Sequence, residues 1–205
     1  MPSDSDAPCV GVNANVVQAE HGLSDGRILW SALAFAAVYV ACAVPVLAWT
    51  GLPLEVLGAS VMLGATLALL SAIDLHTYRL PDVLTLPLAA AGLLFCAVLH
   101  WDEVRWRFLS AALAYLALYS IAVSYQRIRG RQGLGLGDAK LLAASGAWLG
   151  LEGLPTVVLL ASGAACCGVL LNAGLGKRLT SSSAIAFGPF LASATWLVWL
   201  YGPLN

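Results

Sequence analysis

The chain has 205 residues, of which 60% are hydrophobic and 10% are charged, whereas a soluble domain carries roughly 25% charged residues. This composition excludes an ordinary soluble domain and indicates an integral membrane protein that has the lipid bilayer as its first partner. The formal net charge of -1 provides no basic surface, so we expect no nucleic-acid partner.

Residues 1–27 are polar and lack the basic region and short apolar core of a secretion signal. We expect them to form a mostly disordered cytoplasmic tail, followed by one membrane-embedded domain over residues 28–205. The five cysteines show no CxxC spacing, and the histidines lack the spacing of a metal pair. We therefore expect no metal and no cofactor.

Seven apolar runs follow the tail, and a helix of about 20 residues crosses a hydrocarbon core of roughly 30 Å. The predicted spans cover residues 28–50, 54–73, 83–100, 108–125, 138–150, 154–172 and 184–201. The fifth is short, so it would need a thinned bilayer or shielding by protein. The sequence therefore predicts an all-α polytopic helical bundle with about seven transmembrane helices.

The second run ends at Asp74, after which Pro81 disfavours a helical residue before it and Asp82 is placed to cap the third span. The fifth run begins at Asp138 and contains Lys140. We expect the stem of Lys140 to lie along apolar surface, with tuning of Asp138 as the alternative.

The basic residues divide eight to two between the two sides of the membrane if the tail is cytoplasmic. The cytoplasmic set is Arg27, Arg79, Arg127, Arg129, Arg131, Lys140, Lys177 and Arg178, and the outer set is Arg105 and Arg107. This distribution follows the positive-inside rule. The same orientation places Asp74 and Asp138 together on the cytoplasmic side, although neither residue was used to derive it.

Asp74 and Asp138 each stand at the edge of a membrane span, where a carboxylate is costly and so functional by default. Two carboxyls that share a proton can hydrolyse a peptide bond without a metal, because one deprotonates water while the other protonates the carbonyl oxygen. We interpret the two residues as a catalytic pair. If the second helix ends at Asp74 and the fifth begins at Asp138, the helix dipoles favour the anion at Asp138 and predict it as the base.

Gly133, Gly135 and Gly137 alternate ahead of Asp138. They permit positive φ and let an extended substrate backbone approach closely, so we predict an active-site loop there. The stretch is not a dinucleotide fingerprint, because the preceding strand and the sixth position of that motif are missing. The last apolar run contains Phe187-Gly188-Pro189, which predicts a kink or break near its start.

Three ordered motifs resemble the type IV prepilin peptidase family, the GxGD class of intramembrane aspartyl proteases, over about residues 54–200. They are Asp74 with Leu80-Pro81-Asp82, then Gly135-Leu136-Gly137-Asp138-Ala139-Lys140, then Phe187-Gly188-Pro189. The resemblance implies an inner-membrane endopeptidase that removes the short basic leader of prepilins or pseudopilins at the cytoplasmic face. The cut follows a glycine, just before a hydrophobic helix, and serves type IV pilus assembly or type II secretion.

By motif match, the family's catalytic pair carries over to Asp74 and Asp138. Because the implied leader is basic, the cytoplasmic acids are its candidate contacts, either Asp82 or the acidic residues of the tail. Many family members also carry an N-terminal domain with paired CxxC motifs, linked to N-methylation of the new amino terminus. Without CxxC motifs here, we expect a peptidase-only form. The last motif usually has proline where Ala186 stands, which we expect to alter the local kink and not the chemistry.

The alternative from another class is a small transporter or proton-conducting protein with an acid-lined path. It explains the two aspartates but neither the Leu-Pro-Asp motif nor the glycine turn. A non-catalytic assembly subunit is a third interpretation. Ser145-Gly146 and Ser162-Gly163 give a faint signal for a serine protease, but no histidine is placed to serve either serine.

Overall fold

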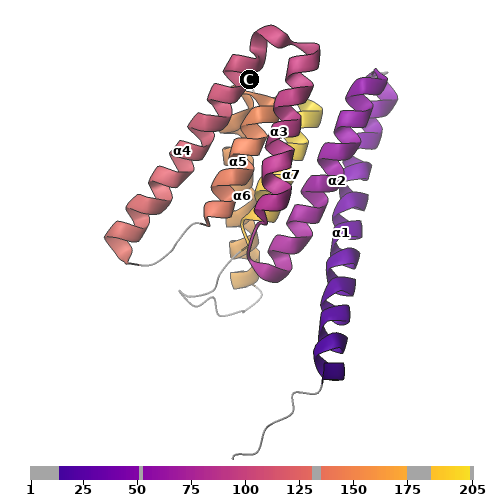
Figure 1. Cartoon of the computed structure of the whole chain (residues 1–205), viewed down its shortest axis with the longest axis vertical. Helices are drawn as coiled ribbons and strands as arrows, with labels where there is room; N and C mark the ends of the chain where they lie inside the picture. The colour runs from indigo at the N-terminus through magenta and orange to yellow at the C-terminus, as the bar shows by residue number, and fades with distance from the viewer. Residues whose placement is uncertain (1–13, 51–52, 131–134, 175–185, 204–205) are drawn as a thin grey trace, which may run out of the picture.

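A computed structural model of the chain describes residues 14–50, 53–130, 135–174 and 186–203 (Figure 1). Over these residues the chain forms helices and no strand, which confirms the predicted all-α membrane bundle. The elements are α1 (Ala14–Thr50), α2 (Leu54–Thr77), α3 (Asp82–Leu99), the 3-10 helix η1 (Trp101–Glu103), α4 (Val104–Arg129), α5 (Leu136–Leu149), α6 (Gly153–Gly174) and α7 (Gly188–Tyr201).

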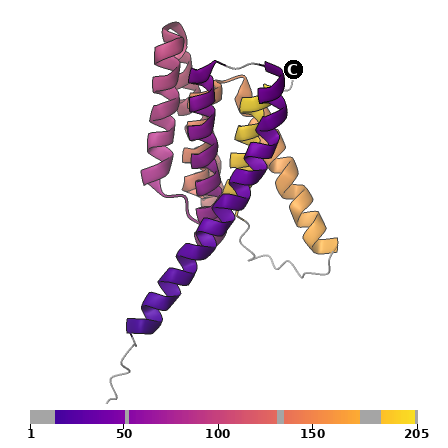
Figure 2. The ribbon, with the colours of Figure 1, turned by 90° about the vertical axis from the view of Figure 1, so that its right-hand side faces the viewer.

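α1 begins at Ala14, so its helix extends into the segment that we expected as a tail, while residues 1–13 lie outside the described part of the chain. At its N-terminal end α1 reaches beyond the rest of the bundle (Figures 1 and 2). The proposed boundary between tail and membrane domain at residue 27 stays a prediction.

Five helical segments are long and apolar enough to cross a membrane. They lie in α1, α2, α3, α4 and α6. The other two, α5 and α7, have 14 residues each. At 1.5 Å per residue such a helix is about 21 Å long, which is shorter than a hydrocarbon core of about 30 Å. The seven predicted runs therefore all form helices, but two of them are too short to span by themselves.

The two short helices lie in the core of the bundle, where the surrounding helices shield them from lipid. Both are buried along most of their lengths. Ser145 of α5 and Thr195 of α7 are joined by a hydrogen bond of 2.7 Å between their hydroxyls. On the other side of α5, the Trp148 indole donates to the Leu88 carbonyl of α3 at 2.9 Å. The short fifth helix is therefore shielded by protein, which is one of the two ways in which its length could be accommodated.

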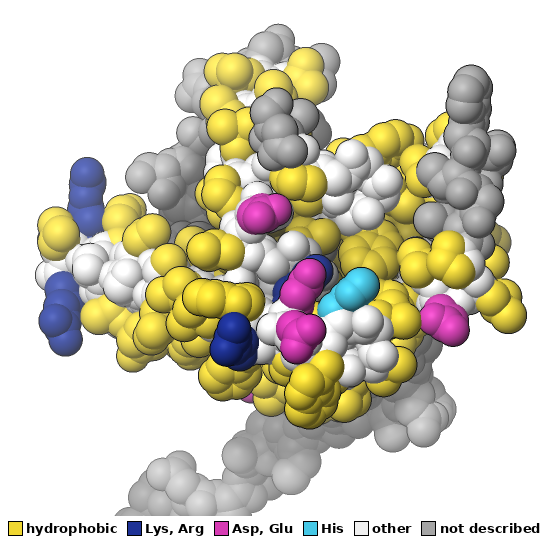
Figure 3. All heavy atoms as spheres, turned by 90° about the horizontal axis from the view of Figure 1, so that it is seen from above, with side chains coloured by type: hydrophobic (Ala, Val, Ile, Leu, Met, Phe, Trp, Pro, Cys, Tyr) yellow, Lys and Arg dark blue, Asp and Glu magenta, His cyan; other side chains and the backbone are white. Residues whose placement is uncertain are grey.

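Successive helices run in opposite directions, so the bundle has two distinct ends (Figures 1 and 2). One end holds the C-terminus of α2 and the N-termini of α3, α5 and α7, and we call it the aspartate end because Asp74 and Asp138 lie there. The opposite end holds η1 and the C-termini of α5 and α7. Seen from that opposite end, acidic, basic and histidine side chains gather among hydrophobic ones (Figure 3).

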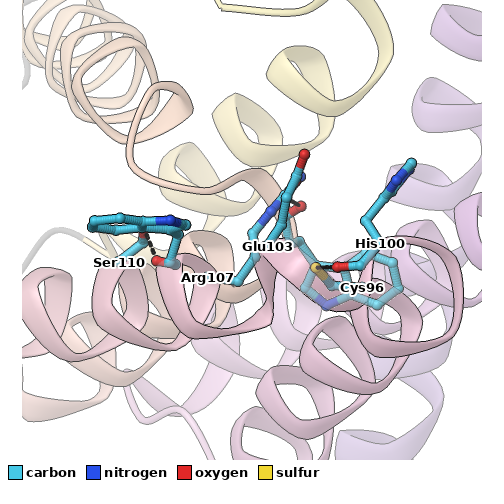
Figure 4. A network of polar contacts seen from close by, with 7 residues as sticks. Cys96, His100, Glu103, Arg107 and Ser110 are labelled. Atoms are coloured by element: carbon cyan, nitrogen blue, oxygen red, sulfur yellow. Dashed lines mark hydrogen bonds and ion pairs between the residues drawn. The ribbon is translucent and has the colours of Figure 1, made fainter.

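A polar network at the opposite end anchors the C-terminus of α5 (Figure 4). The Arg107 guanidinium of α4 donates to the Trp148 carbonyl in the last turn of α5, and it also pairs with Glu103 at 3.4 Å. A cation at a helix C-terminus satisfies free carbonyls and complements the helix dipole. This anchor holds the far end of the helix whose first turn carries Asp138.

Candidate active site

Asp74 lies in the last turn of α2 and is 5% exposed. Its side-chain oxygen Oδ2 accepts a hydrogen bond of 3.0 Å from the backbone N–H of Gly188, the first residue of α7. α2 itself continues to Thr77 and ends on Tyr78, which is in the left-handed conformation with φ 52° and donates its N–H to the Asp74 carbonyl. The carboxyl of Asp74 therefore faces the N-terminus of another helix.

Asp138 lies in the first turn of α5, outside the five candidate spans, and is 8% exposed. Gly135 is the N-cap of this helix and donates its backbone N–H to the Asp138 carboxylate. A carboxylate at the third helical position that reaches back to the N-cap N–H is half of a capping box, which explains why the glycine turn is followed by an acid at this spacing. Burial, and then the charge of Asp74, raise the pKa of Asp138 to about 7 against the opposing effect of the Gly135 hydrogen bond.

The two carboxyls thus occupy the N-termini of two short helices, Asp74 at α7 and Asp138 at α5. The effect of the Asp74 charge on Asp138 places the pair within electrostatic range. A helix N-terminus stabilises an anion, whereas two neighbouring carboxylates disfavour a second negative charge. The arrangement therefore favours a pair that holds one proton and one negative charge.

The assignment of Asp138 as the base is wrong, because it depended on α2 ending at Asp74. The helix runs on to Thr77, and Asp74 instead faces the positive end of α7 through Gly188. Both carboxyls therefore face a helix N-terminus, and the helix dipoles no longer single out Asp138 as the base.

Close packing explains the glycines of this region. A Cβ on Gly188 would lie 2.6 Å from Asp74 Oδ2, and a Cβ on Gly137 would lie 2.9 Å from the Cβ of Leu80. Both values are shorter than real Cβ contacts, so neither position accepts a side chain without movement. Gly133 lies outside the described residues, and its predicted role in the loop stays a prediction.

The prolines and Phe187 shape the backbone next to the carboxyls. Pro81 is the N-cap of α3, and its carbonyl accepts the N–H groups of Leu84 and Thr85. Phe187 is the N-cap of α7, and Pro189 follows in the first turn, where a missing N–H costs nothing. The predicted break near Phe187-Gly188-Pro189 is thus the start of α7, which aims its N-terminus at Asp74.

Asp82 and Lys140 form an ion pair of 2.6 Å between α3 and α5, with side chains 55% and 28% exposed. The prediction of Asp82 as a helix cap is wrong, because Pro81 occupies the N-cap and the first turn of α3 has no side-chain cap hydrogen bond. Asp82 is instead the first helical residue, and its carboxylate turns toward Lys140. The pair joins the start of α3 to the helix that carries Asp138.

Within the described ranges, no group of three or more His, Cys, Asp or Glu side chains is arranged to hold a metal ion. The buried ionisable groups described at the aspartate end are the Asp74 and Asp138 carboxyls, which accept the backbone N–H groups of Gly188 and Gly135. Such a set suits acid–base hydrolysis with water as the nucleophile.

Comparison with known proteins points to one family. Residues 61–171 match the type IV leader peptidase family, and this range includes Asp74 and Asp138. A prepilin leader peptidase/N-methyltransferase of Aeromonas hydrophila is 40% identical over 146 residues, which is 70% of this chain and 49% of that protein. The protein of the same name from Dickeya chrysanthemi is 43% identical over 139 residues, 68% of this chain and 48% of that protein. The chain thus spans about half the length of the curated relatives it matches. No solved structure matches it.

Proposed function

Because the chain belongs to the type IV leader peptidase family, we propose that it is an aspartyl endopeptidase that removes the leader from type IV prepilins or pseudopilins at the cytoplasmic membrane face. The observation that carries this proposal is the pair of buried carboxyls, each held by the backbone N–H at a helix N-terminus. The relatives are named both as leader peptidases and as N-methyltransferases. For this chain we propose the peptidase activity alone.

The proposed reaction needs only the two carboxyls and water. The Asp74 carboxylate takes a proton from water as the water oxygen attacks the scissile carbonyl carbon, while protonated Asp138 gives its proton to the carbonyl oxygen. The tetrahedral intermediate then collapses: the C–N bond breaks, the leaving nitrogen receives a proton from Asp74, and Asp138 takes back a proton from a hydroxyl of the intermediate, which leaves a carboxylic acid and restores both aspartates. Gly188 stabilises the anionic form of Asp74 before attack, and burial keeps the proton on Asp138 near neutrality.

The direct test uses the purified chain in liposomes with a prepilin substrate, followed by a gel that resolves the precursor from the shortened product. Loss of the leader supports the proposal. Transport of protons or solutes by the same liposomes without any cleavage would favour the alternative of a small transporter with an acid-lined path.

The rate of leader cleavage is expected to fall as the pH rises through about 7. Asp138 must be protonated to act as the acid, and its pKa is raised to about 7 by burial and by the charge of Asp74, so the active form is lost above that pH. Initial rates measured from about pH 5 to about pH 9 give the profile, whose alkaline limb reports the essential acid. A rate that keeps increasing above neutrality would contradict the role of Asp138 as the acid.

Asp82 is a candidate contact for the basic leader, because its carboxylate is more than half exposed and already holds one cation, Lys140. Asp82→Asn is expected to raise KM for a basic leader about threefold with little change in kcat, since an exposed ion pair contributes on the order of 0.2–1 kcal/mol. A substrate with neutralised leader charges should lose this difference. Lys140→Gln frees the carboxylate and should lower KM. A change confined to kcat would rule out docking at Asp82.

A further inference from the structure

One buried hydroxyl joins three helices of the bundle. Tyr39 of α1 is 3% exposed. Its hydroxyl lies 3.4 Å from the Ser71 hydroxyl of α2 and 3.2 Å from the Ser193 hydroxyl of α7. We call Tyr39, Ser71 and Ser193 the hydroxyl cluster. It is the polar junction at which α1, α2 and α7 meet.

The hydroxyl cluster lies next to the hydrogen bond that holds Asp74. Ser71 precedes Asp74 by three residues on α2, so the two side chains share one helix face about one turn apart. Ser193 follows Gly188 along α7, the helix that supplies the N–H to Asp74. The junction therefore joins the same two helices as the Asp74–Gly188 bond, deeper in the bundle.

Further contacts fix α1 on both sides of Asp74. The Trp196 indole of α7 donates to the Tyr39 carbonyl at 3.0 Å, and the two rings stack with centroids 5.6 Å apart. Toward the aspartate end, the Ser31 hydroxyl of α1 lies 3.2 Å from Nε2 of His76, two residues beyond Asp74. α1 thus contacts α2 on both sides of Asp74 along the helix, through Tyr39 at Ser71 and through Ser31 at His76.

We propose that Tyr39 is a positioning residue for the peptidase reaction, acting through its hydroxyl to set the separation of α2 and α7 and hence the Gly188 N–H on Asp74. This inference rests on the proposed function. Tyr39 and Ser193 both lie outside residues 61–171 that match the family. Tyr39 can act in this way because a hydroxyl buried in a membrane bundle needs a hydrogen-bond partner, and both partners of the Tyr39 hydroxyl belong to the helices that form the site.

Tyr39→Phe tests the inference, because it removes the hydroxyl and keeps the ring that stacks on Trp196 and the carbonyl that accepts its N–H. We expect kcat for leader cleavage to fall about fivefold and KM to stay within about twofold, as for an interaction that acts on the transition state. The acid limb of the pH profile should also move to higher pH, because the hydrogen bond from the Gly188 N–H, which stabilises the anion at Asp74, becomes weaker.

Ser193→Ala removes one partner of the same hydroxyl and is expected to act in the same direction. The double variant should be little worse than Tyr39→Phe alone, since both changes remove one contact. The matched control is Tyr201→Phe, whose hydroxyl donates to the Cys42 carbonyl of α1 at 3.0 Å and thus joins α7 to α1 at the opposite end. Its kcat and pH profile should match those of the unmodified chain.

The outcomes are distinguishable. If Tyr39→Phe lowers the melting temperature but leaves kcat and the acid limb unchanged, the hydroxyl has a structural role alone and the inference is overturned. If Tyr39→Phe does not fold, Ser193→Ala decides by the same two readouts. If the unmodified chain leaves prepilin intact, the proposed function itself is overturned, and the inference that depends on it goes too.

Discussion

Replacing either Asp74 or Asp138 with asparagine is expected to lower the rate of leader cleavage by at least about a thousandfold. Asparagine keeps the size of the side chain and an oxygen that can accept the Gly188 or Gly135 N–H, so the local packing is retained. It can neither take up the proton of the attacking water nor give a proton to the carbonyl oxygen. Because the two groups act as one unit, the double variant should be no slower than either single variant.

The measurement is leader loss on a gel with each purified variant in liposomes, together with its melting temperature. Asp102→Asn is the matched control, because it makes the same chemical change to an exposed aspartate in η1, at the opposite end of the bundle. It should cleave at the unmodified rate. Cleavage near that rate by Asp74→Asn or Asp138→Asn would exclude the shared-proton mechanism.

The positions of the two acids could be predicted because the signals for them are local. Asp74 ends one long apolar run and Asp138 opens another, and the cost of a carboxylate at such an edge is a property of the residue and its neighbours. The distribution of arginines and lysines then predicted that both acids lie on the same side of the membrane. The structure brings them to the same end of the bundle by alternating the direction of successive helices (Figure 1).

The partners of these acids could not be predicted, because they are distant in sequence. Gly188 is 114 positions from Asp74. The sequence predicts a helix break at Gly188 but gives no sign of the carboxyl that this residue faces. Two predictions from local signals were also wrong, namely the end of the second helix and the cap of the third. The apolar run ends at Asp74, but α2 continues to Thr77, because helical backbone geometry does not require apolar residues. At the start of α3, Asp82 had a suitable residue type for a cap, but Pro81 took the N-cap position.

The second large effect is expected for Gly188→Ala, with a loss of cleavage of about a hundredfold. The added Cβ would lie 2.6 Å from Asp74 Oδ2 and 2.9 Å from its Cγ. Asp74 is buried in the last turn of α2 and has little room to withdraw, so the carboxyl must turn away from the N–H that it accepts. This loss of geometry at the base, and not a loss of fold, is the reason for the effect. Alanine is a better helix former than glycine, so α7 itself should be retained.

Gly58→Ala is the matched control for this prediction, because Gly58 lies in α2, the helix of Asp74, and a Cβ there would meet nothing within 4 Å. It should cleave at the unmodified rate and melt at the same temperature or slightly higher, since alanine in a helix is more stable than glycine by roughly 0.5–1 kcal/mol. A Gly188→Ala variant that is as active as Gly58→Ala would show that Asp74 does not need the α7 N-terminus. Inactivity together with a much lower melting temperature would instead assign Gly188 to folding. The decisive result is therefore a folded Gly188→Ala variant that no longer cleaves, because only the contact between the α7 N-terminus and Asp74 predicts both properties at once.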